Sequence, residues 1–298
     1  MGTLLAVLID GIIYASWLFM IAAGLTLIYG VMRILNIAHG SLYAIGAYAA
    51  ASLTGAWIRG GYPAVGSYAM LALAAIGVGL VLGPAIERGV LRFSYGRDEI
   101  VLVLVTYALF LILEDVVKLV WGVESYFVSE PYVLLGNIEL GPVSYPVYSA
   151  LIVLVAVGIG LALRWAIYGT RYGKLLIAVI HDREVSAALG VDVRAVYLAT
   201  FTLGTMLAAI GGALTAPTVS VVPGMGVEVI VLAFAVVVIG GLGSMPGAAL
   251  GSLVVGLVRS AAVHYSPELE LFSIYAVMAL VLAFRPRGLF VAAEARKI

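Results

Sequence analysis

Long apolar stretches, separated by short polar segments, are the feature of this sequence that most constrains its fold. A bilayer core about 30 Å thick requires roughly 20 apolar residues for each helical crossing, and stretches near this length recur along the chain. Continuous runs favour helices, because a membrane barrel would instead alternate apolar and polar residues over about ten positions. We therefore expect an all-α polytopic helix bundle, organised as one transmembrane domain over residues 1–298.

Composition supports the membrane class and argues against others. Hydrophobic residues make up 64% of the chain and charged residues 11%, whereas soluble domains are about half apolar and a quarter charged. The sequence has no cysteine, and it shows no hydrolytic constellation, phosphate-binding loop or basic nucleic-acid stripe. We expect no catalytic residue, no metal site, no cofactor and no nucleic-acid partner.

Eight or nine membrane segments are expected. The seventh and eighth form a broken pair, because the seventh is short for a full crossing and is typical of a re-entrant or half-length helix. The segments are 5–28, 37–57, 65–86, 100–120, 147–163, 195–216, 229–239, 247–263 and 271–284.

The distribution of basic residues predicts the orientation. Lys and Arg near membrane segments are retained on the cytoplasmic side, and they cluster in residues 88–97, 164–194 and 285–297. The connection 122–146 carries three Glu and no Lys or Arg. We expect a multi-pass protein of the plasma (inner) membrane with an external N-terminus and a cytoplasmic C-terminus.

A first polar island interrupts the apolar pattern at residues 29–40. As a membrane helix, this stretch places Asn36, His39 and Tyr43 on one face, and Gly40 allows close approach of a helix or a solute. Polar groups inside a membrane normally face a bundle interior or a cavity. Two interpretations stay open: these residues line a solute pathway, or they only tie helices together by hydrogen bonds.

The second island is the insertion 164–194. Apolar residues recur at helical spacing over 174–189 and are interrupted at 181–184, which predicts two short cytoplasmic helices joined there. One interpretation is a coupling element for an ATPase; the other is a solvated loop. The candidate coupling residues are Ile177, His181, Asp182, Arg183, Glu184, Ala188 and Gly190.

The third island combines glycine and proline between the two short apolar segments. Gly240, Gly241, Gly243 and Ser244 precede Met245-Pro246-Gly247, a pattern that stops a helix. A broken helix of this kind can expose backbone groups to a solute. The alternative is a tight turn in which small residues pack two helices together.

Charged residues in the fourth segment suggest a rival function. Glu114 and Lys118 have the spacing of a helical ion pair, and Asp115 adds a negative group. With Glu228 they could handle protons or sodium in a stand-alone carrier or channel. We favour a structural role for the cluster because it lies near the predicted external end.

The islands together resemble the permease subunits of the branched-chain amino-acid type ABC transporters, particularly the first of the two permease types. The similarity covers nearly the whole chain, in segments that keep the family's order and spacing. They are Gly24-Leu25-Thr26-Leu27-Ile28-Tyr29-Gly30, Asn36-Ile37-Ala38-His39-Gly40, Arg171-Tyr172-Gly173, Asp182-Arg183-Glu184, Leu189-Gly190-Val191, Gly240-Gly241-Leu242-Gly243-Ser244 and Arg285-Pro286-Arg287-Gly288-Leu289-Phe290.

The resemblance implies an ATP-driven importer of a small polar solute, with branched-chain or other amino acids as the leading expectation. It implies a second permease subunit, as a heterodimer or a homodimer, together with two cytoplasmic ATPases and an external solute-binding protein. Many relatives carry an acidic residue where this chain has Ser41, and many carry Lys where it has Leu232. Family permeases for urea or short amides therefore remain an alternative.

Overall fold

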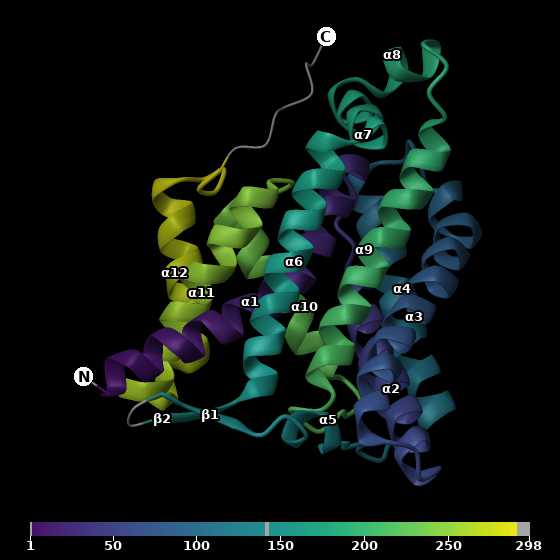
Figure 1. Cartoon of the computed structure of the whole chain (residues 1–298). Coiled ribbons are helices and arrows are strands. Elements are labelled where there is room, and N and C mark those ends of the chain that lie inside the picture. The colour runs from purple at the N-terminus through teal and green to yellow at the C-terminus, as the bar shows by residue number, and fades with distance from the viewer. Residues whose placement is uncertain (1, 141–142, 291–298) are drawn as a thin grey trace.

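The computed structural model describes residues 2–140 and 143–290, and most of them are helical (Figure 1). The long helices are α1 (Gly2–Met32), α2 (His39–Arg59), α3 (Ser67–Gly89), α4 (Glu99–Trp121), α6 (Val147–Gly169), α9 (Val193–Thr215), α10 (Met225–Gly240), α11 (Met245–Tyr265) and α12 (Glu270–Phe284).

Short elements connect these helices at the two ends of the bundle. They are α5 (Glu130–Val133), α7 (Arg171–His181), α8 (Arg183–Ala188), the antiparallel strands β1 (Asn137–Leu140) and β2 (Val143–Pro146), and the 3-10 turns Ala64–Gly66, Leu91–Phe93 and Pro267–Leu269.

The all-α membrane fold expected from the sequence is confirmed. Each of the nine expected segments corresponds to one long helix. Within residues 2–140 and 143–290, seven spans are long and apolar enough to cross a membrane, and Met225–Gly240 is a shorter apolar helix, as its expected length of 229–239 indicated. The helix α2 is not one of these seven spans. The long helices therefore outnumber the spans that length and apolar composition identify.

Two opposite ends of the bundle differ in structure. We call the end that carries α5 and the β1–β2 hairpin the hairpin face, and the end that carries α7 and α8 the cap face (Figure 1). The described chain begins at the hairpin face and reaches Phe290 at the cap face. Arg296 and Lys297, which belong to the basic cluster expected over residues 285–297, lie outside the described residues.

The helix α1 forms the central column of the bundle. Its 31 residues extend about 46 Å, and it packs against α11, α9, α6 and α10. Small residues allow the close approach to α11: a side chain at Gly11 would meet Leu257, and one at Gly256 would meet Ala15. Such contacts stabilise helix pairs in lipid, where water does not drive helices together.

The first four and last four long helices are arranged as two inverted halves. In this arrangement α1, α2, α3 and α4 correspond to α9, α10, α11 and α12. The contact of α1 with α11 is therefore matched by that of α9 with α3, and the contact of α2 with α4 by that of α10 with α12. The halves meet where α1 crosses α9, with Gly24 and Gly204 against each other. The α6 helix connects the halves through the cap. Inverted repeats of this kind are common in transporters, where functional sites lie near the interface between the repeats.

Tight glycine contacts lead to a stability prediction. A side chain at Gly212 of α9 would collide with the Tyr43 carbonyl of α2, whereas one at Gly158 of α6 would meet nothing within 4 Å. We expect Gly212→Ala to lower the free energy of unfolding by about 1–3 kcal/mol because the core is overpacked, and Gly158→Ala to leave it unchanged. Thermal unfolding in one detergent measures both variants, and equal melting temperatures would contradict the packing.

Candidate functional site

The helix α2 begins inside the bundle rather than at its surface. After α1 ends, residues 33–36 are not helical, and α2 starts at His39. His39 Nε2 lies 3.0 Å from the Ile21 carbonyl, which is close to the middle of α1. Asn36 therefore precedes the helix, and the expectation that it shares a helical face with His39 and Tyr43 is wrong.

The helix α10 begins at the same place from the other half. Gly224 adopts a left-handed conformation (φ 86°) that starts the helix, and its 16 residues extend only about 24 Å. Gly226 packs directly on the backbone of Gly40, so that a side chain at either position would collide with the other's carbonyl. Two helix N-termini therefore meet inside the bundle, and glycine is required for their contact.

A buried carboxylate from α4 lies at this junction. Ser41 Oγ, in the first turn of α2, lies 3.2 Å from Glu114 Oε1 and donates a hydrogen bond to it. A Cβ at Gly226, in the first turn of α10, would lie 3.1 Å from the same oxygen. Helix N-termini carry partial positive charge, and a negative carboxylate stabilises both of them.

The expected ion pair between Glu114 and Lys118 is wrong. Lys118 Nζ lies 3.1 Å from Asp115 Oδ1, and both of these side chains are exposed, at 47% and 71%. Glu114 is only 7% exposed and faces α2 instead. The reason is helical geometry, since neighbouring residues on one helix point in different directions and the spacing alone does not say which of them faces the bundle.

A cavity of about 650 Å³ extends from the hairpin face toward this junction. Tyr43 lines it, as the sequence indicated, and so does Glu228. The remaining lining residues come from α1, α5, β2, α6, α9, α10, α11 and the segment before α10. They are Asp10, Ile13, Tyr14, Trp17, Tyr132, Tyr145, Pro146, Ser149, Ile152, Thr215, Thr218, Val219, Ser220, Val222, Met225, Val229, Leu232 and Arg259.

Arg259 is the most informative lining residue that the sequence reasoning missed. Its guanidinium lies 3.9 Å over the Tyr14 ring, and it forms an ion pair with Glu270. The signal was present, because a single Arg within an apolar segment is by default a functional candidate. Asp10 and Tyr14 had no comparable pattern in the sequence.

Polar groups also surround the cavity near the hairpin face. Asp10 lies 3.4 Å from His264 Nε2. Burial and the adjacent Asp10 carboxylate, which accepts its hydrogen bond, raise the pKa of Tyr145 to about 12. The phenol therefore stays protonated at neutral pH and donates to Asp10.

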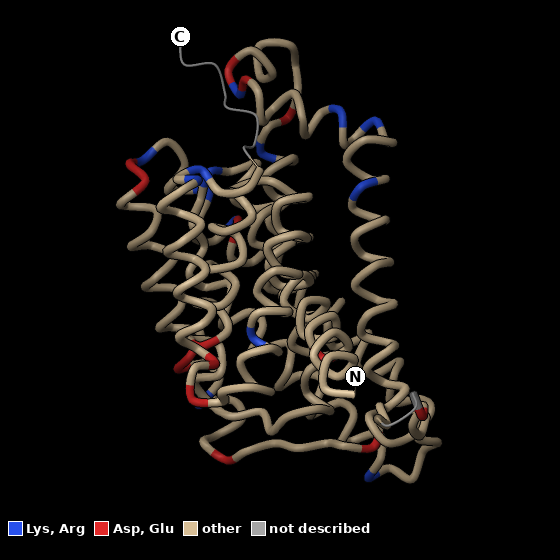
Figure 2. The backbone as a smooth tube through the Cα atoms, turned by 90° about the vertical axis from the view of Figure 1, so that its left-hand side faces the viewer, with Lys and Arg blue, Asp and Glu red and all other residues tan. Residues whose placement is uncertain are grey.

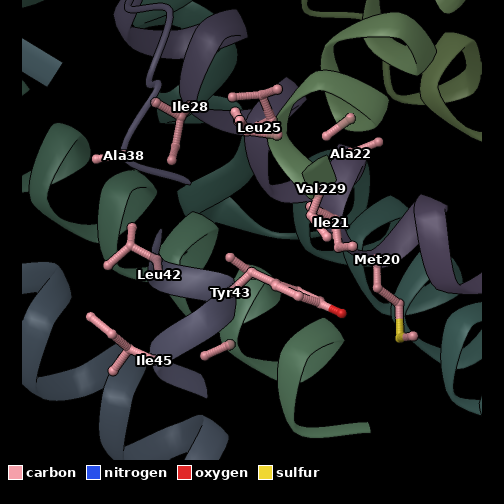
Figure 3. Close-up of a cluster of buried hydrophobic side chains, with 14 of the residues drawn as sticks. Met20, Ile21, Ala22, Leu25, Ile28, Ala38, Leu42, Tyr43, Ile45 and Val229 are labelled. Atoms are coloured by element: carbon pink, nitrogen blue, oxygen red, sulfur yellow. The ribbon is translucent and has the colours of Figure 1, made fainter. Parts of the chain in front are cut away.

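Buried apolar side chains close the cavity at its inner end. Tyr43 lies among Met20, Ile21 and Val229, each at most 5% exposed (Figure 3). The Tyr43 hydroxyl interacts with Thr215 of α9 and with Trp17 of α1. This cluster separates the cavity from the cap face.

The glycine turn between α10 and α11 lies at the cap face, away from the cavity. Gly247 packs on the Gly240 backbone and Gly251 packs on the Val236 carbonyl. These contacts are the ones expected of a tight turn in which small residues pack two helices together. Ser244 Oγ accepts a hydrogen bond from the Gly247 amide at 3.1 Å. Gly241 is in close contact with the Phe290 carbonyl.

The structure therefore does not bring the predicted pathway residues into one site. His39 contacts Gly24 of α1, whereas Gly243 contacts Gly30, six residues or about 9 Å farther along that helix. Gly243 and Ser244 instead line a second cavity of about 380 Å³ together with Ile177 and His181 of α7.

The expected pair of short helices is present as α7 and α8. Thr170 and Asp182 accept amide hydrogen bonds at their N-termini, at 3.0 and 2.9 Å, and Gly190 ends the second with φ 86°. Most of the candidate coupling residues are exposed: His181, Arg183, Glu184, Ala188 and Gly190. Ile177 and Asp182 are partly buried.

These features define a polytopic helical membrane protein of the transport class, with two inverted halves and a cavity between them. The chain belongs to the family of branched-chain amino acid transport system permease components, whose model matches residues 7–282.

Relatives are similar over almost their whole length. The high-affinity branched-chain amino acid transport system permease protein BraD of Pseudomonas aeruginosa is 30% identical over 305 residues, covering 98% of this chain and 97% of that protein. The corresponding permease protein LivH of Escherichia coli (strain K12) is 28% identical, covering 97% and 96%. PsaBC from Streptococcus pneumoniae, solved with a Fab, is 14% identical with a TM-score of 0.45, covering 91% of this chain and 87% of that chain.

The junction carboxylate gives a second prediction. We expect Glu114→Ala to lower the free energy of unfolding by about 1–3 kcal/mol, because Ser41 loses its hydrogen-bond acceptor and two helix N-termini lose a nearby carboxylate. The double variant S41E/E114A returns a carboxylate to the junction from α2 and should recover most of that loss. Asp115→Ala, which removes an exposed neighbour, is the control. Thermal unfolding of the four proteins is the measurement, and a double variant less stable than Glu114→Ala would contradict the assignment.

Proposed function

We propose that the chain is the membrane-spanning permease subunit of an ATP-driven importer for amino acids, and not an enzyme. The observation that carries the proposal is the family match over residues 7–282 on a bundle whose cap projects exposed helices from one end. Branched-chain amino acids are the leading solutes, because both relatives described above are named for their transport. A separate external solute-binding protein would supply much of the selectivity.

The proposed orientation has the hairpin face outside and the cap face in the cytoplasm. Lys and Arg gather at the cap face (Figure 2), which is the distribution expected of a cytoplasmic side. The N-terminus is then external and the C-terminus cytoplasmic. The cavity opens to the outside, where a binding protein would deliver solute.

Residues 164–194 form the proposed coupling insertion to two cytoplasmic ATPases. The cap carries exposed apolar side chains beside charged ones: Leu189 is 80% exposed and Val185 is 53% exposed, next to Arg183 and Glu184. Exposed apolar groups rimmed by polar residues are typical of protein interfaces. Arg183 also lies 5.6 Å from the Tyr197 ring of α9, so a force on α8 reaches a helix of the core.

We infer that transport alternates around the junction of α2 and α10. The junction and the apolar cluster at Tyr43 lie between the outer cavity and the cap face. Movement of α9 would separate the residues of this barrier and open a path between the two sides. Within the described part of the chain, both amide atoms of Asn36 and the His39 Nδ1 are buried without a hydrogen-bond partner. Buried polar atoms of this kind are costly and would gain partners when water or solute passes.

Charge reversal at Glu184 tests the coupling. We expect Glu184→Arg to keep membrane insertion and assembly but to reduce ATP-driven uptake at least about tenfold, because a contact to a charged partner group is worth about 1.5–3 kcal/mol. Glu139→Arg at the hairpin face is the matched control and should retain uptake. Uptake and solute-stimulated ATP hydrolysis are measured in proteoliposomes. Normal values of both in Glu184→Arg would refute the coupling role.

Substitutions at Asn36 and His39 test the pathway. We expect Asn36→Leu and His39→Leu to reduce uptake severalfold without loss of assembled transporter, since each removes polar atoms that the open pathway would use. His39→Gln keeps a donor for the Ile21 carbonyl and should retain more uptake than His39→Leu. Unchanged uptake in both leucine variants, at equal amounts of protein, would return these residues to a purely structural role.

A further inference from the structure

The cavity at the hairpin face contains charged groups of both signs. Glu228 of α10 and Arg259 of α11 line the same space of about 650 Å³, a volume typical of small-molecule sites. We propose that this cavity binds an α-amino acid as a zwitterion, with Arg259 holding the carboxylate and Glu228 holding the ammonium group. The inference rests on the proposed function, because it identifies the solute site within the permease.

Arg259 is held ready for an anionic ligand. Its guanidinium stacks on Tyr14 at 3.9 Å and pairs with Glu270, and its side chain remains 29% exposed. A guanidinium has five N–H donors, and one carboxylate takes at most two of them side by side. Donors therefore remain for a second carboxylate, and the stacking fixes the plane in which they point.

Glu228 provides the opposite charge in the same region. It is exposed where it lines the cavity, and it forms no ion pair with any basic residue in the part of the chain that the structure describes. The Tyr14 hydroxyl is within electrostatic range of both Glu228 and Arg259, so the two charges share one polar patch. An unpaired carboxylate on a membrane helix is costly and is characteristically matched by a cation.

The remaining wall suits an aliphatic side chain. Ile152, Val229 and Leu232 line the cavity beside the charged pair. A cation alone would leave the remaining N–H donors of Arg259 unused and an anion alone would leave Glu228 without a cation, whereas a zwitterion satisfies both groups. Asp10 of the same lining is engaged by His264 and Tyr145. The combination of Arg259, Glu228 and an apolar wall therefore selects an apolar amino acid over an amine, a carboxylic acid or a sugar.

Ligand analogues that lack one charge test each contact separately. The assembled transporter is placed in nanodiscs of phosphatidylglycerol, and labelled L-leucine is displaced by L-leucine, L-leucinamide or 4-methylpentanoate. We expect the wild type to prefer L-leucine over each analogue by at least about tenfold, the size of one hydrogen bond to a charged group. Arg259→Gln should abolish the preference over L-leucinamide only. Glu228→Gln should abolish the preference over 4-methylpentanoate only.

Controls separate recognition from structure. Glu268→Gln changes an exposed charge near the same face, outside the cavity lining, and should keep both preferences. Arg259→Lys and Glu228→Asp keep the charges and should keep part of each preference, should the glutamine variants fail to assemble. Variants that weaken all three ligands equally, or that leave both preferences intact, overturn the proposal.

Three further outcomes are decisive. Native mass spectrometry that finds phosphatidylethanolamine retained by the wild type from its source membrane and lost in both glutamine variants would assign the cavity to a lipid head group and overturn the amino-acid site. Wild-type protein with the expected preferences but without ATP-driven uptake would refute the proposed function and support the site. ATP-driven uptake with unchanged preferences in both variants would refute only the site.

Discussion

The contact between Gly40 and Gly226 is the constraint on which the rest of the structure depends. It requires α2 and α10 to begin inside the bundle, where unpaired backbone N–H groups would be costly in an apolar environment. The Glu114 carboxylate, which accepts a hydrogen bond from Ser41, supplies negative charge at that point. Because both helices start at this depth, longer helices around them carry the bundle from one end to the other, and a cavity forms on the side of the junction that faces the hairpin.

The inverted halves give this junction its functional meaning. The connection 33–38 approaches from the cap face and buries Asn36, whereas the connection before α10 approaches from the hairpin face and lines the cavity with Thr218 and Ser220. One half thus shapes the closed side and the other shapes the open side. Exchange of these roles between equivalent halves is a simple way to alternate access, because similar packing is available to both.

The type and approximate position of the helices could be predicted from the sequence because the length of an apolar run and the positions of Gly and Pro are local properties. The cap helices were predictable for the same reason, since the pattern over 174–189 repeats at helical spacing. The start of α2 inside the bundle could not be predicted, because Asn36 lies in a stretch that reads as helical. The environment of Glu114 could not be predicted either, because its spacing from Lys118 is that of an ion pair. Which face of α4 meets α2 depends on tertiary packing. Arg259 carried a readable signal, but its partners Tyr14 and Glu270 come from distant segments, and only the fold brings them together.

The central claim is that this chain transports solute only as part of an ATP-driven assembly. The most direct test is uptake of labelled L-leucine into proteoliposomes that contain either the chain alone or the chain with its second permease subunit, two ATPases and binding protein. We predict uptake only by the full assembly, only with hydrolysable ATP on the cap-face side. Leucine flux through the chain alone, or flux driven by a proton or sodium gradient without ATP, would contradict the account and identify a stand-alone carrier.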